Sequence, residues 1–233
     1  MQPIGDHNRF YLAEDRRLEP KEYFKFLVEQ AAGRLSKPPV RVLDIGCAAG
    51  ELLYYLRSIY PHASLTGTDV TPQLLAKARQ AVPDAEFVLS DIYSGANLPT
   101  EPFDVVFMSG VNYLFAQYEP WIRNLLPLTR HSAYVFGIFN PDDLDVRATV
   151  QRSGDPTSAT GWNLISRKSI SLFLDSLRVA HRFIEWELPL AIPRSHDDPI
   201  RSWSIETRDG RFLAINGMQI VHRFAALHID RSA

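Results

Sequence analysis

The sequence lacks paired cysteines and long apolar runs. Its single cysteine, Cys47, excludes an intrachain disulfide, which favours a reducing compartment, so we expect a cytoplasmic protein. The N-terminal residues MQPIGDHNRFYLAEDRR have no signal-peptide apolar stretch. Nowhere do about 18 uncharged apolar residues occur together, so no membrane association is expected. A formal net charge of −2 gives no general attraction to nucleic acid, and none is expected as a partner.

Internal repeats and low-complexity tracts are also absent, and helical and strand patterns alternate from residue 20 onward. Five mostly continuous apolar runs predict buried parallel strands at 40–47, 63–70, 85–91, 103–110 and 132–140. Apolar residues three and four apart predict helices at 20–35, 51–60, 71–82, 118–129 and 166–177, with Thr71 and Ser166 as caps. The alternation predicts one α/β domain over 1–233 with a mostly parallel sheet.

The residues on either side of this alternating region have different sequence patterns. We expect an N-terminal helical cap over 1–37 and, after residue 179, an antiparallel C-terminal end to the sheet. Asp209-Gly210 lies between two β-type runs and predicts an added hairpin. Two polar stretches, 141–165 and 189–201, are rich in turn residues, and long connections of this kind are more often functional than idle. We interpret both as insertions on the acceptor side of an active site.

The stretch VLDIGCAAGELLYYL, residues 42–56, predicts a strand, a glycine turn and a helix. A dinucleotide fingerprint would place glycines or alanine at positions 46, 48 and 51, but the chain has Gly46, Ala48 and Glu51. Glutamate has the wrong charge beside a diphosphate. With Asp44 and Gly50, the turn instead resembles the first motif of the class I S-adenosylmethionine-dependent methyltransferases, although Ala48 replaces that family's middle glycine.

The resemblance continues at the ends of the later strands and covers roughly 38–140. It implies that Asp69 binds the ribose hydroxyls, that Asp91 and Ile92 bind the adenine, and that Ser109 and Gly110 approach the methionine portion. It also implies a seven-stranded Rossmann-like sheet, with S-adenosylmethionine as cofactor and S-adenosylhomocysteine as product. The implied cofactor-binding set is Asp44, Gly46, Cys47, Ala48, Gly50, Asp69, Val70, Asp91, Ile92, Ser109 and Gly110. Within it, Cys47 has no nucleophile arrangement around it and is interpreted as a packing residue.

No catalytic residue stands out in the sequence, and no metal site is indicated. Methyl transfer needs a general base only if the acceptor keeps its proton at neutral pH. The candidates for such a base are Tyr113, His181 and His222. His196 and Asp142 are further candidates. Acceptor contacts are expected from Tyr11, Tyr113, Arg147 and Trp162, and from Phe10, Arg152, Arg194 and Trp203, because these side chains stack on rings or bind hydroxyl and carboxylate groups.

The sequence therefore favours a small-molecule methyltransferase acting on a sugar or secondary-metabolite hydroxyl or amine. Three alternatives stay open. A nucleic-acid methyltransferase would carry an Asn-Pro-Pro-Tyr-like motif after the fourth strand, where this chain has SGVNYLF. A nicotinamide oxidoreductase would share the ribose-binding carboxylate. A regulatory protein could bind the cofactor without turnover. Nothing in the sequence indicates the oligomeric state.

Overall fold

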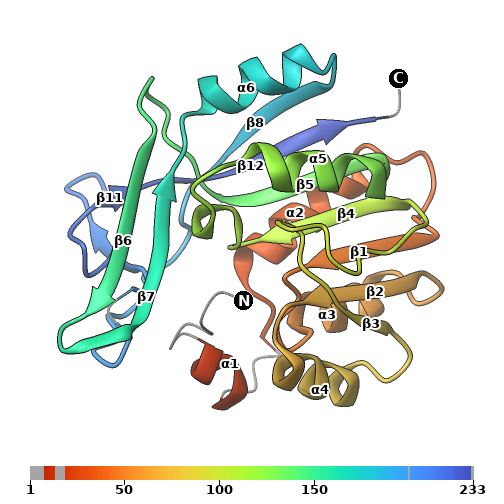
Figure 1. The fold of residues 1–233 in the computed structure, drawn as a ribbon, viewed down its shortest axis with the longest axis horizontal. Coiled ribbons are helices and arrows are strands. Elements are labelled where there is room, and N and C mark those ends of the chain that lie inside the picture. The colour runs from red at the N-terminus through yellow and green to blue at the C-terminus, as the bar shows by residue number, and fades with distance from the viewer. Residues whose placement is uncertain (1–7, 14–18, 199, 232–233) are drawn as a thin grey trace.

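The structure is a computed structural model that describes residues 8–13, 19–198 and 200–231. Its central sheet has seven strands in the order β3-β2-β1-β4-β5-β12-β8 (Figure 1). These strands are β1 (Arg41–Ile45), β2 (Ser64–Asp69), β3 (Glu86–Leu89), β4 (Phe103–Ser109), β5 (Thr129–Ile138), β8 (Ala180–Trp186) and β12 (Phe224–Asp230). β12 runs antiparallel to both of its neighbours, β5 and β8, while β1 to β5 are parallel. The predicted seven-stranded, mostly parallel sheet with an antiparallel C-terminal strand is confirmed.

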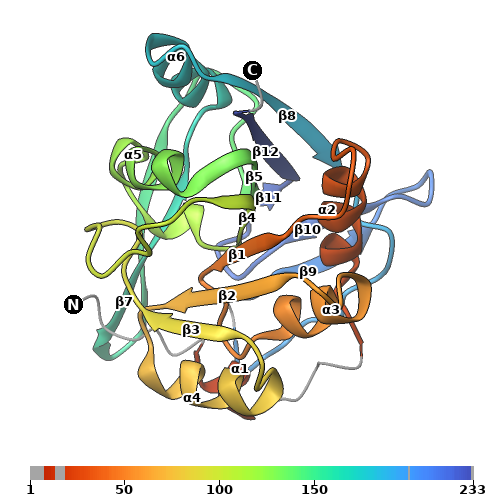
Figure 2. The same cartoon turned by 90° about the vertical axis from the view of Figure 1, so that its right-hand side faces the viewer.

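The strands are continuous apolar runs because helices cover both faces of the sheet. One face packs against α2 (Glu22–Ala32), α3 (Glu51–Ile59) and α4 (Pro72–Ala81), and the other against α5 (Glu119–Leu128) and α6 (Arg167–Ser176) (Figure 2). Successive residues of a strand point to opposite faces. Tyr134 of β5 therefore lies in one core, and its neighbours Ala133 and Val135 lie in the other.

The two predicted helix caps have different outcomes. Ser166 accepts a hydrogen bond from the backbone N–H of Lys168 at 3.1 Å, so the predicted cap of α6 is confirmed. Thr71 does occupy the N-cap position of α4, with Pro72 in the first turn as predicted, but its side chain makes no capping hydrogen bond. Instead, the Asp69 carboxylate accepts the backbone N–H of Thr71 at 2.8 Å, because the strand ends two residues earlier and brings its last side chain to the helix start.

The polar stretch 141–165, expected as an irregular insertion, contains an antiparallel hairpin. Its strands are β6 (Val146–Arg152) and β7 (Asp155–Leu164), joined through Gly154 at a φ of +80°. The strands form a two-stranded sheet separate from the central one (Figure 1). In β6, the apolar residues Val146, Ala148 and Val150 alternate with the polar Arg147 and Thr149, a pattern typical of a half-buried strand. The stretch therefore carried a strand signal that the sequence interpretation missed.

A second small sheet follows β8 and holds β9 (Trp203–Glu206), β10 (Phe212–Ile215) and β11 (Val221–His222). The predicted Asp209-Gly210 hairpin between β9 and β10 is confirmed. The expected cap over 1–37 contains α1 (Asn8–Ala13) and α2, while its residues 1–7 and 14–18 lie outside the described part, as does residue 199 of the loop 189–201. Among the described residues, no helix is both long and apolar enough to span a bilayer.

Candidate functional site

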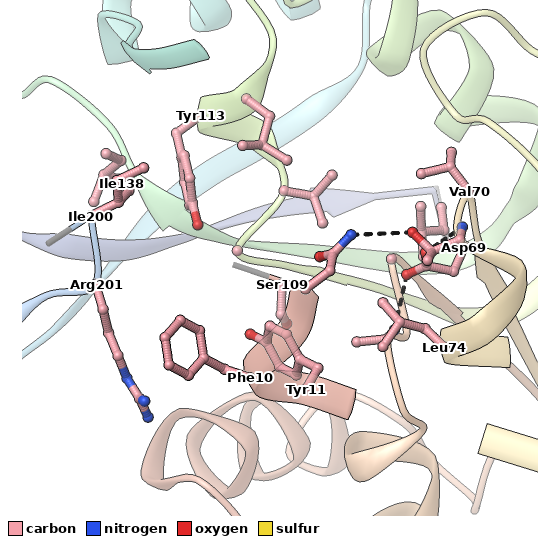
Figure 3. Close-up of a pocket in the computed structure, with 18 of the residues that line it drawn as sticks. Phe10, Tyr11, Asp69, Val70, Leu74, Ser109, Tyr113, Ile138, Ile200 and Arg201 are labelled. Carbon is pink, nitrogen blue, oxygen red and sulfur yellow. Dashed lines mark hydrogen bonds between the residues drawn. The ribbon is translucent and has the colours of Figure 1, made fainter. Parts of the chain in front are cut away.

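A cavity of about 1010 Å³ opens at the carboxyl ends of the parallel strands. The ends of β1, β2 and β4 meet there because parallel strands present the same end to one edge of the sheet, where α/β folds bind ligands. In Figure 3, Asp69 and Val70 lie at one side of the cavity and Ile200 and Arg201 at the other, with Ser109 between them. The cavity therefore joins the sheet edge to the C-terminal insertions.

The glycine turn after β1 forms one wall of this cavity. Gly46, Ala48 and Gly50 have φ angles of +72°, +47° and +82°. A Cβ at Gly46 would lie 2.5 Å from Cγ2 of Val111, so only glycine fits there. Ala48 accepts the left-handed conformation at a cost of roughly 1–2 kcal/mol. With positive φ at every second residue, the turn places Gly46 and Ala48 against the cavity, whereas Gly50 packs against α4.

Asp69 connects this turn to the end of β2. One carboxylate oxygen accepts the backbone N–H of Ala48 at 3.0 Å, and the other accepts that of Thr71 at 2.8 Å. Burial raises the pKa of Asp69, although these N–H groups oppose the shift by stabilising the charged form. Asp69 lines the cavity, so the carboxylate holds the turn and faces a ligand at once.

A buried ion pair lies beside the turn. Lys21 Nζ is 2.6 Å from Oε2 of Glu51, the first residue of α3, and Lys21 lines the cavity. Burial lowers the pKa of Lys21, but Tyr11, Tyr23 and Glu51 raise it more, so the ammonium stays charged. Glu51, which we treated as an uncompensated negative charge, is therefore neutralised by Lys21. The charge argument against a diphosphate at this turn is correspondingly weaker.

Asp44 lies behind the cavity wall and is almost fully buried. Burial, and then the neighbouring Asp69 carboxylate, raise the pKa of Asp44 well above its ordinary value. Cys47 is also buried, in the core beneath the turn, and burial raises the pKa of its thiol. Asp44, Cys47 and Gly50 are not among the cavity-lining residues of the described chain. These three residues lie behind the part of the turn that lines the cavity, and their role in cofactor binding stays a prediction.

The ends of β3 and β4 supply the next part of the wall. Asp91 accepts the backbone N–H of Tyr93 at 2.8 Å and the hydroxyl of Ser94 at 2.9 Å, and it lines the cavity beside Ile92. Ser109 and Gly110 line the cavity at the end of β4. The Ser109 hydroxyl is buried and has no hydrogen-bond partner among the described residues. A buried hydroxyl without a partner is costly, so this group can bond to a molecule in the cavity.

The far side of the cavity is an aromatic chamber, which we define by Phe10, Tyr11, Tyr113, Trp162 and Trp186. The rings of Tyr113 and Trp162 lie 4.6 Å apart. Burial raises the pKa of Tyr113, which keeps its phenol protonated at neutral pH and disfavours it as a base. The indole N–H of Trp162 is buried and has no partner within the described part of the chain. Like Ser109, it can donate to a bound molecule.

Several residues singled out in the sequence lie elsewhere. Arg147 is not a lining residue of the described cavity, because it donates to the Ala116 carbonyl at 2.7 Å and pairs with Asp145 at 3.2 Å. His181 contacts the Val179 carbonyl at 3.0 Å. His222 does not line the cavity but lies 2.9 Å from the hydroxyl of Ser202, which does. Also outside the described lining are Asp142, Arg194, His196, Trp203 and His181 itself.

Sequence reasoning missed lining residues that no local pattern marks. They come from the N-terminal segment, the end of β8, the loop before β9 and the start of β12, which are far apart in the chain. These residues are Lys21, Tyr23, Trp186, Arg201, Ser202 and Phe224. Arg152, Ser158 and Thr160 of the hairpin also line the cavity, as do Leu190 and Ile192 of the loop 189–201. Both expected insertions therefore contribute to the chamber.

Residues 42–131 match a family model described as a methyltransferase domain. This segment runs from β1 into β5 and includes the glycine turn, Asp69 and Asp91. Over this segment, the chain is therefore similar to a methyltransferase domain, in keeping with the resemblance of its glycine turn to the class I S-adenosylmethionine-dependent methyltransferases. Its sheet order, with the antiparallel β12 inserted between β5 and β8, agrees with this resemblance.

Curated relatives of this chain include trans-aconitate 2-methyltransferases. The one from Klebsiella pneumoniae is 34% identical over 114 residues, which cover 46% of this chain and 44% of the relative. That from Methylobacterium nodulans is 34% identical over 134 residues, covering 53% and 50%. The chain thus spans about half the length of the curated relatives it matches.

Solved structures show the same fold over most of the chain. The YcgJ protein of Bacillus subtilis superposes with a TM-score of 0.60 at 15% identity, covering 91% of this chain and all of that protein. The plantazolicin methyltransferase BpumL, solved with S-adenosylhomocysteine and a monoazolic desmethylPZN analogue, gives a TM-score of 0.60 at 16% identity, covering 95% of this chain and 88% of that one. At such identities the likeness concerns the fold alone.

Proposed function

We propose that this protein transfers a methyl group from S-adenosylmethionine to a small organic acceptor. The observation that carries the proposal is the continuity of the cavity from Asp69 and Asp91, past Ser109, to the aromatic chamber. Sites for one small ligand occupy roughly 300–1,000 Å³. At about 1010 Å³, this cavity has room for a cofactor and an acceptor together.

The sheet-edge part of the cavity fits the cofactor. Asp69 would accept the ribose hydroxyls, and Asp91 with Ile92 would meet the adenine. Gly46, Ser109 and Gly110 would face the methionine portion, where the unpartnered Ser109 hydroxyl gains a partner. The Lys21 ammonium suits the cofactor's carboxylate.

The acidic surroundings suit the cofactor's positive charges. Asp69 lies beside the glycine turn and lines the cavity, and its carboxylate favours a nearby cation. The ammonium and sulfonium groups of S-adenosylmethionine provide such cations, whereas a pyrophosphate would be repelled. Relatives of the same fold have been solved with S-adenosylhomocysteine, which supports the same cofactor here.

Bound S-adenosylmethionine supplies an electrophilic methyl group, so the protein's task is mainly alignment. Phe10, Tyr11, Tyr113 and Trp162 would exclude water and hold the acceptor in line with the methyl group. Gly46 and Gly110 allow the backbone to approach closely. Alignment of this kind accounts for several kcal/mol of rate acceleration without any covalent intermediate.

The acceptor is a small molecule with a hydroxyl or amine, and the chamber's composition supports this. Aromatic rings suit stacking on a ring or an apolar face, while Arg152 and Arg201 suit oxygen-rich groups. The relatives' name indicates a carboxylic acid as a further candidate. A nucleic-acid acceptor is the alternative enzyme function, and cofactor binding without turnover is the alternative outside enzymes.

Transfer of tritium from methyl-labelled S-adenosylmethionine tests the proposal. The panel holds sugars, phenols, amines, trans-aconitate and RNA. We expect label to appear in at least one small molecule and not in RNA. Label in RNA alone would favour the nucleic-acid reading. S-adenosylhomocysteine binding with no transfer to any acceptor would favour a regulatory protein.

A further inference from the structure

A serine and a histidine from two different segments meet at the wall of the aromatic chamber. Ser202 lies just before β9 and lines the cavity beside Arg201. Its Oγ is 2.9 Å from Nε2 of His222, which lies in β11 and is 4% exposed. The imidazole thus lies behind the wall and reaches the cavity through the serine hydroxyl. His222 has no opening of its own in the described lining.

The second ring nitrogen determines which tautomer is present. Nδ1 of His222 lies 3.1 Å from the backbone carbonyl of Ile220, which can only accept a hydrogen bond. Nδ1 must therefore carry the proton, which leaves Nε2 as an acceptor for the Ser202 hydroxyl. Ser202 then donates to the imidazole and keeps its oxygen lone pairs for a molecule in the cavity.

The surroundings keep this imidazole uncharged. The groups that contact it are neutral: the Ser202 hydroxyl, the Ile220 carbonyl, and the rings of Trp162 and Phe224, centred 5.9 and 5.3 Å away. The charged side chains next to Ser202 and His222 in sequence, Arg201 and Arg223, are both cations and favour no second proton. Burial lowers the pKa of His222 below its ordinary value, so the ring is available to accept a proton at neutral pH.

We propose that Ser202 and His222 form a proton relay that deprotonates an acceptor hydroxyl during methyl transfer. This inference rests on the proposed function. The acceptor oxygen bonds to the methyl carbon as the carbon–sulfur bond breaks and its electron pair stays on sulfur. The acceptor proton passes to Ser202 Oγ while the serine proton passes to Nε2 of His222. The imidazolium releases its proton to water after the products leave.

The relay narrows the acceptor class. An alcohol or phenol keeps its proton at neutral pH and needs a base, whereas a carboxylic acid is already ionised and needs none. A site that accepts only carboxylates would gain nothing from a neutral imidazole behind a serine. The acceptor is therefore a hydroxyl compound, and the relay distinguishes this chain's chemistry from the acid named for its relatives.

Steady-state kinetics of Ser202→Ala and His222→Gln test the relay, with phenol and catechol as hydroxyl probes and trans-aconitate as the carboxylate probe. General-base catalysis contributes roughly 10²–10⁴-fold, so we expect kcat on hydroxyl probes to fall about 100-fold or more in both variants, with KM changed little. Ser202→Thr should restore the rate because it restores a hydroxyl. His62→Gln, at an exposed position outside the described cavity, is the control.

Wild-type kcat in both variants would overturn the relay, as would methylation of trans-aconitate but of no hydroxyl compound. Failure to bind S-adenosylhomocysteine would instead refute the proposed function. If no probe is methylated, nitrogen-15 NMR of the histidine rings decides. The relay requires a neutral His222 with its proton on Nδ1 at pH 7, and a shift of the Nε2 signal in Ser202→Ala. A proton on Nε2, or a charged ring, would contradict it.

Discussion

The carboxylate of Asp69 serves the glycine turn and the cavity together. It accepts two backbone N–H groups within 3.0 Å and also faces the space assigned to the ribose. We predict that Asp69→Asn weakens S-adenosylhomocysteine binding roughly 10- to 100-fold, because each hydrogen bond to a charged group contributes about 1.5–3 kcal/mol. Calorimetric titration measures the change. Glu101→Gln, outside the described cavity lining, should bind normally, and unchanged affinity in folded Asp69→Asn would reduce Asp69 to a turn residue.

His228 makes stability depend on pH. Its ring stacks on Tyr134 at 4.8 Å, and burial, aided by the charges of Arg34 and Arg182, lowers its pKa to about 4. Between pH 6.5 and about 4 the unfolded chain therefore binds more protons at this position than the folded one, and stability falls as pH falls through this window. The slope from this residue approaches about 1.4 kcal/mol per pH unit.

Urea unfolding at pH 5, 6 and 7 tests this prediction in His228→Phe, which keeps the ring but cannot titrate. The free energy of unfolding should depend less on pH in the variant than in the wild type. His62→Gln should keep the wild-type dependence, because His62 is exposed. Equal slopes in wild type and His228→Phe would show that His228 titrates normally.

At this scale, the sequence could predict residues that follow recognisable strands. Asp69, Asp91 and Ser109 end successive strands, so their common position at the sheet edge followed from the order of elements. Lys21 and Ser202 could not be predicted, because they reach the cavity only through packing between distant segments. Arg147 was expected to contact the acceptor, but its side chain donates to the carbonyl of Ala116 in another loop, a contact that the sequence also could not predict.

At the scale of elements, the Lys21–Glu51 pair ties the N-terminal segment to the first turn of α3. The two side chains are 19% and 8% exposed. We predict that Lys21→Met lowers the free energy of unfolding by about 3 kcal/mol, because it leaves a buried carboxylate without its partner. Urea unfolding measures the loss. The double variant Lys21→Met, Glu51→Gln should recover part of it, and a single variant as stable as the wild type would contradict the coupling.

Gly161 sets how closely β7 approaches the turn that carries Tyr113. A Cβ at this position would lie 2.4 Å from the Leu114 carbonyl oxygen. We predict that Gly161→Ala pushes the hairpin away, lowers stability by roughly 1–3 kcal/mol and slows methyl transfer. Binding of S-adenosylhomocysteine should persist, because Asp69 and Asp91 lie on the opposite side of the cavity.

Thermal unfolding and calorimetry of Gly161→Ala separate these effects. Gly33→Ala is the matched control, since its added Cβ would meet its nearest neighbour, the Glu29 carbonyl oxygen, at 3.5 Å, an ordinary contact. Normal stability and normal turnover in Gly161→Ala would mean that the hairpin position is irrelevant to the acceptor.

Elements buried on both faces were predictable, and the appended ones were less so. The strands and helices around the two cores carry apolar periodicities that tertiary packing requires. In the hairpin β6–β7, the short alternation of Val146, Ala148 and Val150 with polar residues is a strand signal, but it was obscured by the many turn residues around it. The side-chain hydrogen bond expected from Thr71 at the start of α4 does not form, because the neighbouring Asp69 carboxylate accepts the free backbone N–H instead.

At the scale of the whole molecule, the fold brings a sheet edge typical of α/β folds together with a chamber built from appended segments. The parallel strands determine where a cofactor would bind, since their carboxyl ends and the glycine turn form one wall. The N-terminal segment, the hairpin and the loop before β9 form the other. The sequence could predict the first wall through its motif, but the second depends on how three separate segments pack.

Isothermal titration of the intact protein with S-adenosylhomocysteine and with NAD tests the central claim most directly. Both ligands carry an adenosine whose ribose could meet Asp69, but only one carries a pyrophosphate. The account predicts one site that binds S-adenosylhomocysteine and no measurable binding of NAD, because Glu51 occupies the position that a dinucleotide fingerprint fills with glycine or alanine. Binding of NAD with no response to S-adenosylhomocysteine would contradict it.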